Sequence, residues 1–248
     1  MHAIILVMGV VLAGGPSPAS APPQERRIVV DQRMGKRLEL VRLAAAETTP
    51  PMEGTLELVE GEVHRRLADR IGAAVLTPDG SVLAIRDGAL LRLDASGRAT
   101  AVLAQGLAPE LEIDPAGERV ALVRPLPQGG STVEVLELSS QATTTVVSGG
   151  GYNNAPAFTP DGRTLLFVSS RTGVSSLFRV GMDGAELKQL TNRGLKAAVG
   201  PSFVPPPERG AARRFETGRL TWTAEGERWF VDPVTERSGR LAAQGGAR

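Results

Sequence analysis

The feature that most constrains the fold is a short apolar run held between two turn signals. Leu165-Leu166-Phe167-Val168 is apolar at every position, after the turn Pro160-Asp161-Gly162 and before Asp183-Gly184. An antiparallel strand with one wet face alternates apolar and polar side chains, so this strand must be covered on both faces. A lone four-stranded sheet cannot cover both of its own faces. A blade packed between two neighbouring blades can.

Turn residues divide the surrounding stretch, 150–194, into four β-rich runs at 155–159, 164–169, 176–180 and 186–190. Pro109, Pro156 and Pro201 recur at spacings of 47 and 45 residues, which is typical of propeller blades. We therefore predict an all-β fold, a β-propeller of four-stranded antiparallel blades. The mature length fits five blades, within a range of four to six.

The remaining predicted units are less regular. In the first unit we expect strands at 27–30, 37–41, 55–59 and 63–67, and in the second at 74–77, 82–85, 89–93 and 99–103. The third unit starts at Pro109 and continues through strands at 120–123, 132–138 and 143–147. The fifth has strands at 201–204 and 219–223, a strand ending at Asp232, and a strand at 239–242. Residues 205–217 are predicted to be an insertion. The run 27–31 could instead close the ring as a strand of the last blade, which would change the blade count by one.

The best-defined unit also resembles a known family. Its residue order is Asn154-x-Pro156-x-Phe158-Thr159-Pro160-Asp161-Gly162, Phe167-x-Ser169-x-Arg171-x-Gly173, Met182-Asp183-Gly184 and Leu190-Thr191. This order is similar to the WD-like repeat of TolB-type β-propellers and covers about a fifth of the chain well. Only the propeller part is resembled, because TolB proteins also carry an N-terminal α/β domain. The resemblance implies a bacterial periplasmic setting and partners such as a peptidoglycan-associated lipoprotein.

The first residues have the features of an export signal. An uncharged apolar run at 3–14 is followed by a small-residue, proline-containing segment at 15–21. We predict a signal peptide at 1–21, a linker at 22–26 and the propeller at 27–248, with a periplasmic or secreted location. The alternative is a first buried strand or a retained anchor. No later segment is long and apolar enough to span a membrane.

Composition limits the classes of partner. With 42% hydrophobic and 22% charged residues, the chain is typical of an ordered globular protein. A formal net charge of +1 argues against nucleic acid, which needs a clustered basic excess. The absence of cysteine excludes disulfides, thiolate metal sites and a cysteine nucleophile. We expect a monomer whose partner is a protein or a cell-envelope component.

The sequence does not point to catalysis. His64 is the single histidine outside the predicted signal segment, and no Gly-x-Ser-x-Gly nucleophile elbow is present. We therefore predict a half-exposed strand histidine and no catalytic residue, cofactor or metal site. A channel-based hydrolase or lyase acting on a small molecule or glycan, assisted by Ca²⁺ bound to carboxylates, remains the alternative.

Acidic residues in turns have a structural explanation. Asp79, Asp114, Asp161 and Asp183 each stand beside Gly or Pro, where a short carboxylate accepts backbone N–H groups and stabilises a bend. Two such acids from different blades could also form a glycosidase pair, but only with a separation that sequence spacing does not fix. For Arg171, pairing with a turn aspartate is favoured over contact with a ligand.

Function is expected at one rim of the propeller. The loops that join successive blades, and those between the second and third strands of a blade, meet at one rim, where rigid sheets present them for recognition. This places the candidate partner-binding residues Asn153, Asn154, Arg171 and Asn192 together. Trp222, Trp229 and Phe230 could form a binding platform, although packing in the last blade explains them better.

Three functional classes follow from these observations. The leading hypothesis is an exported, non-catalytic, TolB-like propeller that binds a protein or envelope component through that rim. The second is the channel-based enzyme, and the third is a structural spacer without a ligand.

Overall fold

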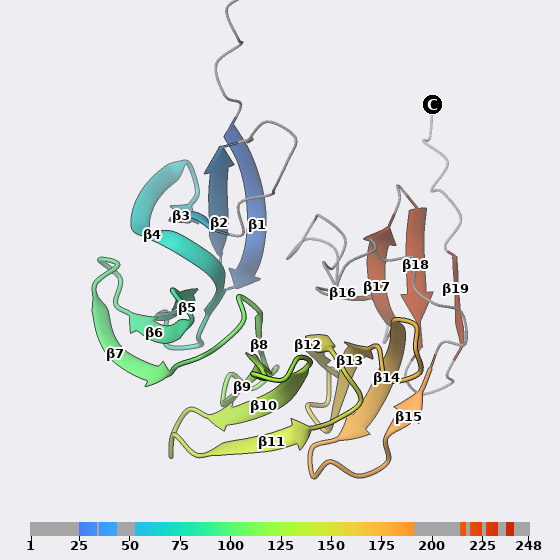
Figure 1. Cartoon of the computed structure of the whole chain (residues 1–248). Helices are drawn as coiled ribbons and strands as arrows, with labels where there is room; N and C mark the ends of the chain where they lie inside the picture. Colours follow the sequence, from blue (N-terminus) through green and yellow to red (C-terminus); the bar gives the residue numbers. More distant parts are fainter. Residues whose placement is uncertain are drawn as a thin grey trace, which may run out of the picture.

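A computed structural model describes residues 25–33, 35–43, 53–190, 214–216, 219–224, 227–232 and 237–240. Within these ranges every regular element is a β-strand, which confirms the predicted all-β class. The described part of the chain holds no helix with the length and apolar character that crossing a bilayer requires. Figure 1 shows the sheets following one another round a common centre, as in a β-propeller.

The first sheet has seven antiparallel strands in chain order: β1 (Glu25–Arg33), β2 (Lys36–Leu43), β3 (Gly54–Glu60), β4 (Val63–Leu76), β5 (Val82–Arg86), β6 (Ala89–Leu93) and β7 (Ala99–Ala104). The second holds β8 (Leu111–Ile113), β9 (Arg119–Pro125), β10 (Ser131–Glu137) and β11 (Thr143–Val147). The third holds β12 (Asn153–Phe158), β13 (Thr164–Ser169), β14 (Ser176–Gly181) and β15 (Lys188–Gln189). The fourth holds β16 (Arg214–Glu216), β17 (Arg219–Ala224), β18 (Glu227–Val231) and β19 (Ser238–Arg240).

One strand joins the first two predicted units. The sequence predicts separate strands at 63–67 and 74–77, whereas β4 runs unbroken through both. Its first part pairs with β3 and its second part with β5, with register shifts at Leu56/Glu57 and Ile71/Ala73. β-bulges of this kind bend a strand, so β4 leaves one blade and enters the next without a loop. Figure 1 shows its strong curvature.

The middle strand of the third sheet confirms the argument from the apolar run. Leu165, Leu166, Phe167 and Val168 on β13 are all buried. Leu165 and Phe167 pack with Val133 and Val135 of the second sheet, whereas Leu166 and Val168 pack on the opposite face with Ala157 and Leu177. Both faces are therefore buried, and the second sheet covers one of them.

In the neighbouring sheets, too, successive side chains of one strand are buried on opposite faces. On β5, Val82 and Ala84 pack toward the first blade, and Leu83 and Ile85 pack toward the second sheet. On β9, Leu122 packs in this second cluster and Ala121 in the cluster shared with the third sheet. Burial of this kind contributes about 25 cal/mol per Å² of apolar surface, so these shared faces stabilise the contacts between blades.

The first blade is different because one of its faces is polar. Leu38, Leu40, Leu56 and Leu58 of β2 and β3 are buried against the second blade. The residues between them point to the other face, and the aligned pair Glu39 and Glu57 lies there. Alternation of this kind is typical of a sheet with one wet face.

The strand 27–30 lies in the first unit as expected, whereas the last sheet departs from the prediction in one detail. β1 pairs with β2 in the first sheet, so the residues 27–31 belong to the first blade rather than closing the last one. β16, the first strand of the last sheet, lies within the segment 205–217 that the sequence predicts as an insertion. The expected first strand at 201–204 lies outside the described residues. The number of blades stays a prediction.

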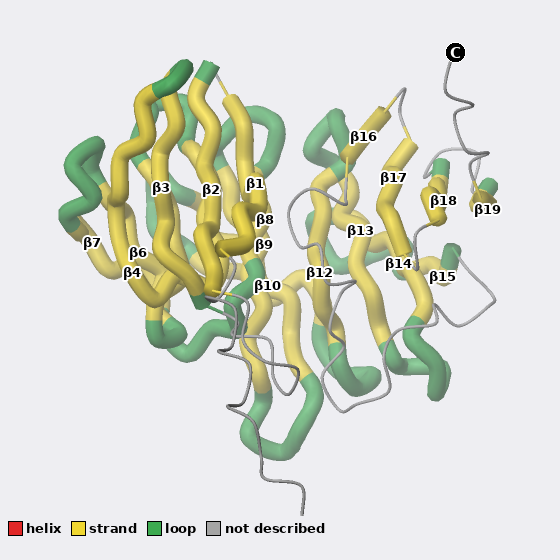
Figure 2. Tube along the Cα trace, turned by 90° about the horizontal axis from the view of Figure 1, so that it is seen from above, coloured by secondary structure: helices red, strands yellow, loops and turns green. Residues whose placement is uncertain are grey.

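The loops gather at the two ends of the strands, as Figure 2 shows. Because neighbouring strands are antiparallel, the β7–β8, β9–β10, β11–β12 and β13–β14 connections share one rim. The turns β4–β5, β8–β9 and β12–β13 lie on the other rim. The outer strands β7, β11, β15 and β19 lie farthest from the centre in Figure 1.

Candidate functional site

The candidate site is the part of the loop rim where the second and third sheets meet. We call it the glycine rim and define it by the loops 126–130, 148–152 and 170–175. Gly130, Gly149, Gly150 and Gly151 all have positive φ, between 63° and 85°. A Cβ on Gly130 would lie 2.7 Å from the carbonyl oxygen of Gly151, so the two loops touch backbone to backbone. Only glycine allows both this φ and this approach.

Asn153, at the start of β12, fixes the three loops to one another. Its side chain is fully buried, and its amide nitrogen donates to the carbonyl oxygens of Ser131 (2.6 Å), Gly149 (2.9 Å) and Gly151 (3.2 Å). Its Oδ1 accepts hydrogen bonds from Ser169 (2.8 Å) and Arg171 (3.0 Å). A predicted contact residue thus holds the rim together from beneath.

Asn154, the next predicted contact residue, shares the partner Ser131 with Asn153. Its side chain is 7% exposed, and its Oδ1 accepts a hydrogen bond of 3.3 Å from Ser131 Oγ. Within the described residues no hydrogen bond is made by its amide nitrogen, which leaves this group as a donor. Asn192 lies outside the described residues.

Arg171 is the charged residue among the predicted contacts, and it lies in a loop of the glycine rim. Its Nε donates to Ser169 Oγ (3.0 Å) and its Nη2 to Asn153 Oδ1 (3.0 Å). The guanidinium also lies over two rings of the third sheet, 5.5 Å from the centre of Phe167 and 5.2 Å from that of Phe178. These cation–π contacts hold the side chain in place by the attraction between its charge and the ring faces.

The electrostatics of Arg171 differ from the expectation. We predicted a turn aspartate as its partner, but in the described part of the chain its hydrogen bonds go to neutral oxygen atoms. Burial lowers the pKa of the Arg171 guanidinium, because desolvation disfavours the charged form. Arginine nevertheless stays protonated, so a positive charge lies half-buried at the rim.

A strained residue lies beside the same junction on the inner strand. Ala155 has φ of 55°, and its N–H donates to Glu110 Oε2 at 2.6 Å. Glu110 lies just before β8 and is 9% exposed. Left-handed backbone at a non-glycine residue costs about 1–3 kcal/mol, which surrounding contacts must offset. The bond to Glu110 ties the innermost strands of the second and third sheets together and fixes Asn153 and Asn154 beside it.

The turn acids on the opposite rim have the structural role that the sequence predicts. Asp161 Oδ1 accepts hydrogen bonds from Thr159 Oγ1 (2.6 Å) and the Arg163 N–H (3.0 Å). Asp183 Oδ1 accepts one from the Ala185 N–H (3.0 Å). Asp114 occupies the position of Thr159 in its own turn and is fully buried, with Arg119 Nε 2.9 Å from its Oδ2. These carboxylates stabilise turns.

The turn of Asp79 holds its carboxyl in the charged form. Hydrogen bonds from Thr77 Oγ1, and then from the backbone and hydroxyl of Ser81, lower the pKa of its carboxyl to about 2. Arg92 adds an ion pair of 3.2 Å. The charged form is stabilised by donors within the turn, so this acid is unsuited to proton transfer at neutral pH.

A second polar cluster was not predicted. Arg27 Nη1 lies 2.7 Å from Glu57 and 3.4 Å from Glu39, on the polar face of the first blade. His64 Nδ1 lies 3.3 Å from the same Glu57 carboxylate, and its side chain is 43% exposed, which confirms the predicted half-exposed strand histidine. The signal in the sequence was the alternation Arg37-Leu38-Glu39-Leu40, which marks a wet face.

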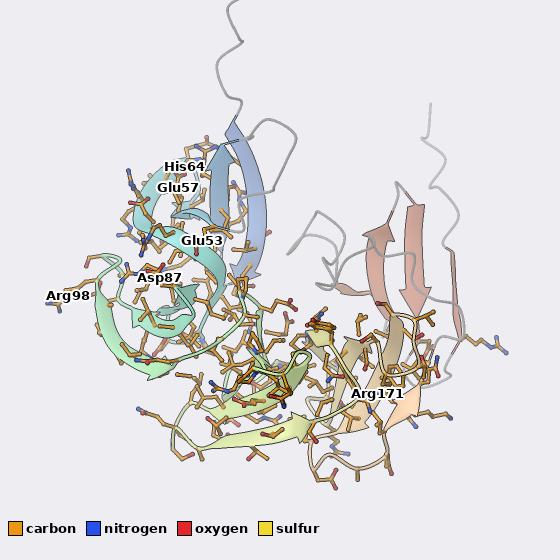
Figure 3. All side chains as sticks on the ribbon, in the orientation of Figure 1. Glu53, Glu57, His64, Asp87, Arg98 and Arg171 are labelled. Carbon is orange, nitrogen blue, oxygen red and sulfur yellow. The ribbon has the colours of Figure 1, made fainter. Side chains whose placement is uncertain are left out.

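This cluster contains residue types that bind metal ions, but the side chain of Arg27 lies among them. Single ligand atoms of Glu39, Glu57 and His64 lie within 4.8 Å of one another. Arg27 lies among them, and its hydrogen bond is the main cause that lowers the pKa of Glu57. A cation would have to displace Arg27, so these residues fit an internal ion-pair network better than a metal. Figure 3 shows Glu57 and His64 far from Arg171.

Comparisons with known proteins address the fold. No family model matches the chain. The uncharacterised protein Atu1656 of Agrobacterium fabrum is 35% identical over 75 residues, which are 30% of this chain and 24% of that protein. A protein assigned as TolB from Agrobacterium tumefaciens has a TM-score of 0.60 at 17% identity, over 82% of this chain and 76% of that one. The chain folds as a TolB-like β-propeller.

Other solved structures place this TolB-like propeller among proteins of several functions. TolB from Acinetobacter baumannii has a TM-score of 0.55 at 20% identity, over 75% of this chain and 48% of that one. An oligogalacturonate lyase in complex with manganese has a TM-score of 0.53 at 14% identity, over 89% and 73%. Identities this low show a shared fold and leave function to be argued from the site.

Proposed function

We propose that this TolB-like propeller is an exported, non-catalytic protein that binds a protein or cell-envelope component through the glycine rim. The observation that carries the proposal is the rigid placement of a half-buried cation, Arg171, by Asn153, Ser169 and two aromatic rings. Loops held on rigid sheets are the usual site of recognition. Export of the mature chain after removal of residues 1–21, to the periplasm or the exterior, belongs to the same proposal.

The experiment compares the two rims directly. A photocrosslinking residue replaces exposed Thr172 at the glycine rim, and in a matched variant it replaces exposed Ser140 in the β10–β11 turn of the opposite rim. Both proteins are expressed with the natural N-terminus and irradiated in an envelope fraction. We expect a discrete crosslinked protein from position 172 and none from position 140. Equal labelling at both positions, or none at either, would count against the proposal.

A second candidate function, an enzyme, is favoured by one observation: the fold is shared with an oligogalacturonate lyase solved in complex with manganese. The melting temperature with and without chelator, followed by turnover on panels of glycans and small molecules, separates the two functions. A chelator-sensitive melting temperature together with turnover would establish the enzyme. Unchanged melting without turnover supports the binding protein.

A further inference from the structure

Arg171 carries a charge that the described part of the chain does not neutralise. Arg119 offers the closest comparison, because its guanidinium also lies over a ring, 5.7 Å from the centre of Phe158. Arg119 has an acidic partner, with its Nε 2.9 Å from Asp114 Oδ2. Arg171 has the same kind of stacking, but among the described residues its hydrogen-bond acceptors are a hydroxyl and an amide oxygen. A half-buried cation that has no counterion among the described residues favours an external anion.

The unused donors of Arg171 have a defined direction. A guanidinium has five N–H groups, and Arg171 uses one on Nε and one on Nη2. Within the described residues, Nη1 makes no hydrogen bond, so the edge formed by Nη1 and Nη2 keeps donors for a ligand. The stacking over Phe167 and Phe178 and the bond to Asn153 fix the plane of that edge.

The neighbouring loop packs against the Arg171 side chain. A Cβ on Gly150 would lie 2.6 Å from the Cβ of Arg171 and 3.2 Å from its Nε, so the loop backbone lies directly against the side chain. In the described part of the chain, the amide N–H groups of Gly149, Gly150 and Gly151 donate no hydrogen bond to the protein. Backbone N–H groups without an acceptor in the protein can donate to a ligand.

We infer that Arg171 and the loop 148–152 form a carboxylate-binding site, and that the partner presents an acidic side chain or a C-terminal carboxylate there. The inference rests on the proposed function for its partner but concerns the ligand chemistry of the site. Two parallel N–H groups of a planar guanidinium match the two oxygens of a carboxylate. The groups that contact Arg171, namely Asn153, Ser169, Phe167, Phe178 and Gly150, add no second cation, so a singly charged anion is a better match than a phosphate dianion.

The test uses the full chain labelled with ¹⁵N and acetate as the probe, titrated against chloride at constant ionic strength. We expect saturable shifts of the Arg171 Nε–Hε and Gly150 amide resonances with acetate and none with chloride. Arg171→Gln should weaken acetate binding by about tenfold or more, as loss of a charged hydrogen-bond donor predicts. The matched control is Arg163→Gln on the opposite rim, which should bind acetate like the unmodified protein.

Further titrations identify which kind of carboxylate binds and test phosphate as the alternative ligand. A blocked peptide with one aspartate and a neutral peptide with a free C-terminus distinguish side-chain from terminal carboxylates. Saturation by inorganic phosphate at lower concentration than acetate would overturn the carboxylate assignment in favour of a phosphate ligand. A linear, unsaturated acetate response in the unmodified chain would overturn it without any variant, so misfolding of Arg171→Gln does not obscure the result.

The two experiments distinguish failure of the carboxylate site from failure of the proposed function. Crosslinking from position 172 that persists in Arg171→Gln, with no acetate saturation, would remove the carboxylate site and leave the binding rim intact. Acetate saturation without any crosslinked partner would support the site and contradict the partner-binding function.

Discussion

At the scale of single residues, short polar side chains determine how this chain turns and which loops meet. Asp79 accepts hydrogen bonds from Thr77 and Ser81 inside one turn, and Asn153 joins three loops with five hydrogen bonds. Both residue types have side chains short enough to reach their own backbone. The difference between them is distance along the chain, because Asp79 acts within its own turn and Asn153 acts between sheets.

The first prediction concerns the pH dependence of stability at Asp79. Its folded-state pKa of about 2 is lower than its ordinary value of 3.8, so the ionised carboxylate stabilises the fold. This contribution is present in full above the unfolded pKa and is lost as the pH falls through the folded pKa. Asp79→Asn should therefore lower the melting temperature at pH 7, with a difference that shrinks between about pH 4 and pH 2.

Thermal melts of both proteins from neutral to acidic pH measure this difference. Glu118→Gln is the control, because Glu118 is exposed and its carboxylate makes no interaction within the described residues. A melting-temperature difference for Asp79→Asn that stays constant with pH would show that the charge of the carboxylate is not what stabilises the turn.

At the scale of elements, neighbouring blades are joined by a shared strand and by direct contacts between their turns. β4 belongs to two blades, and Arg119 of β9 donates from Nη2 to the carbonyl oxygen of Gly162 (2.8 Å) in the next blade's turn. A Cβ on Gly117 would lie 2.1 Å from Cγ of Pro78, in the turn of the preceding blade. The turns of the second, third and fourth predicted units therefore interlock along one rim.

The second prediction tests this contact with two glycines of similar conformation. Gly117 and Gly80 have φ of 75° and 80°, but a Cβ on Gly80 would meet no atom of the described residues within 4 Å. Both alanine variants pay for a left-handed residue, about 1 kcal/mol or more. Gly117→Ala should lose about 1–3 kcal/mol in addition, because Pro78 and the turn must move apart.

Urea unfolding of the two variants gives the comparison, with the free energy of unfolding as the readout. Equal losses for Gly117→Ala and Gly80→Ala would mean that the turns are not in firm contact, and that backbone conformation alone explains the glycines.

At the scale of the whole molecule, stability comes from faces shared between sheets. Phe167 packs with Val133 and Val135 of the second sheet, and the adjacent Leu166 packs within the third sheet. The first blade departs from this pattern, since Arg27, Glu39, Glu57 and His64 form ion pairs on its polar face. Apolar burial therefore holds the blades from the first to the fourth predicted unit, and the far face of the first blade is suited to water.

The third prediction follows from these opposite faces of one strand. Phe167→Ala should lower the free energy of unfolding by about 3–5 kcal/mol and Leu166→Ala by about 2–5 kcal/mol. Hydrogen exchange should separate them, because Phe167→Ala removes packing from two sheets and should reduce amide protection in β10 as well as β13. Leu166→Ala should affect β12 and β13 while leaving β10 close to its original protection. Loss of β10 protection in both variants, or in neither, would contradict a radial stack.

The sequence by itself determined the strands, the turns and the need for covered faces. The run 165–168 predicted burial on both sides, and the acids Asp79, Asp114, Asp161 and Asp183 predicted turns, because these effects act within a few residues. Tertiary structure alone decided the continuity of β4, the ion pairs around Glu57 and the neutral partners of Arg171. Those contacts depend on strand register and on the approach of loops distant in the chain, which local residue patterns do not specify.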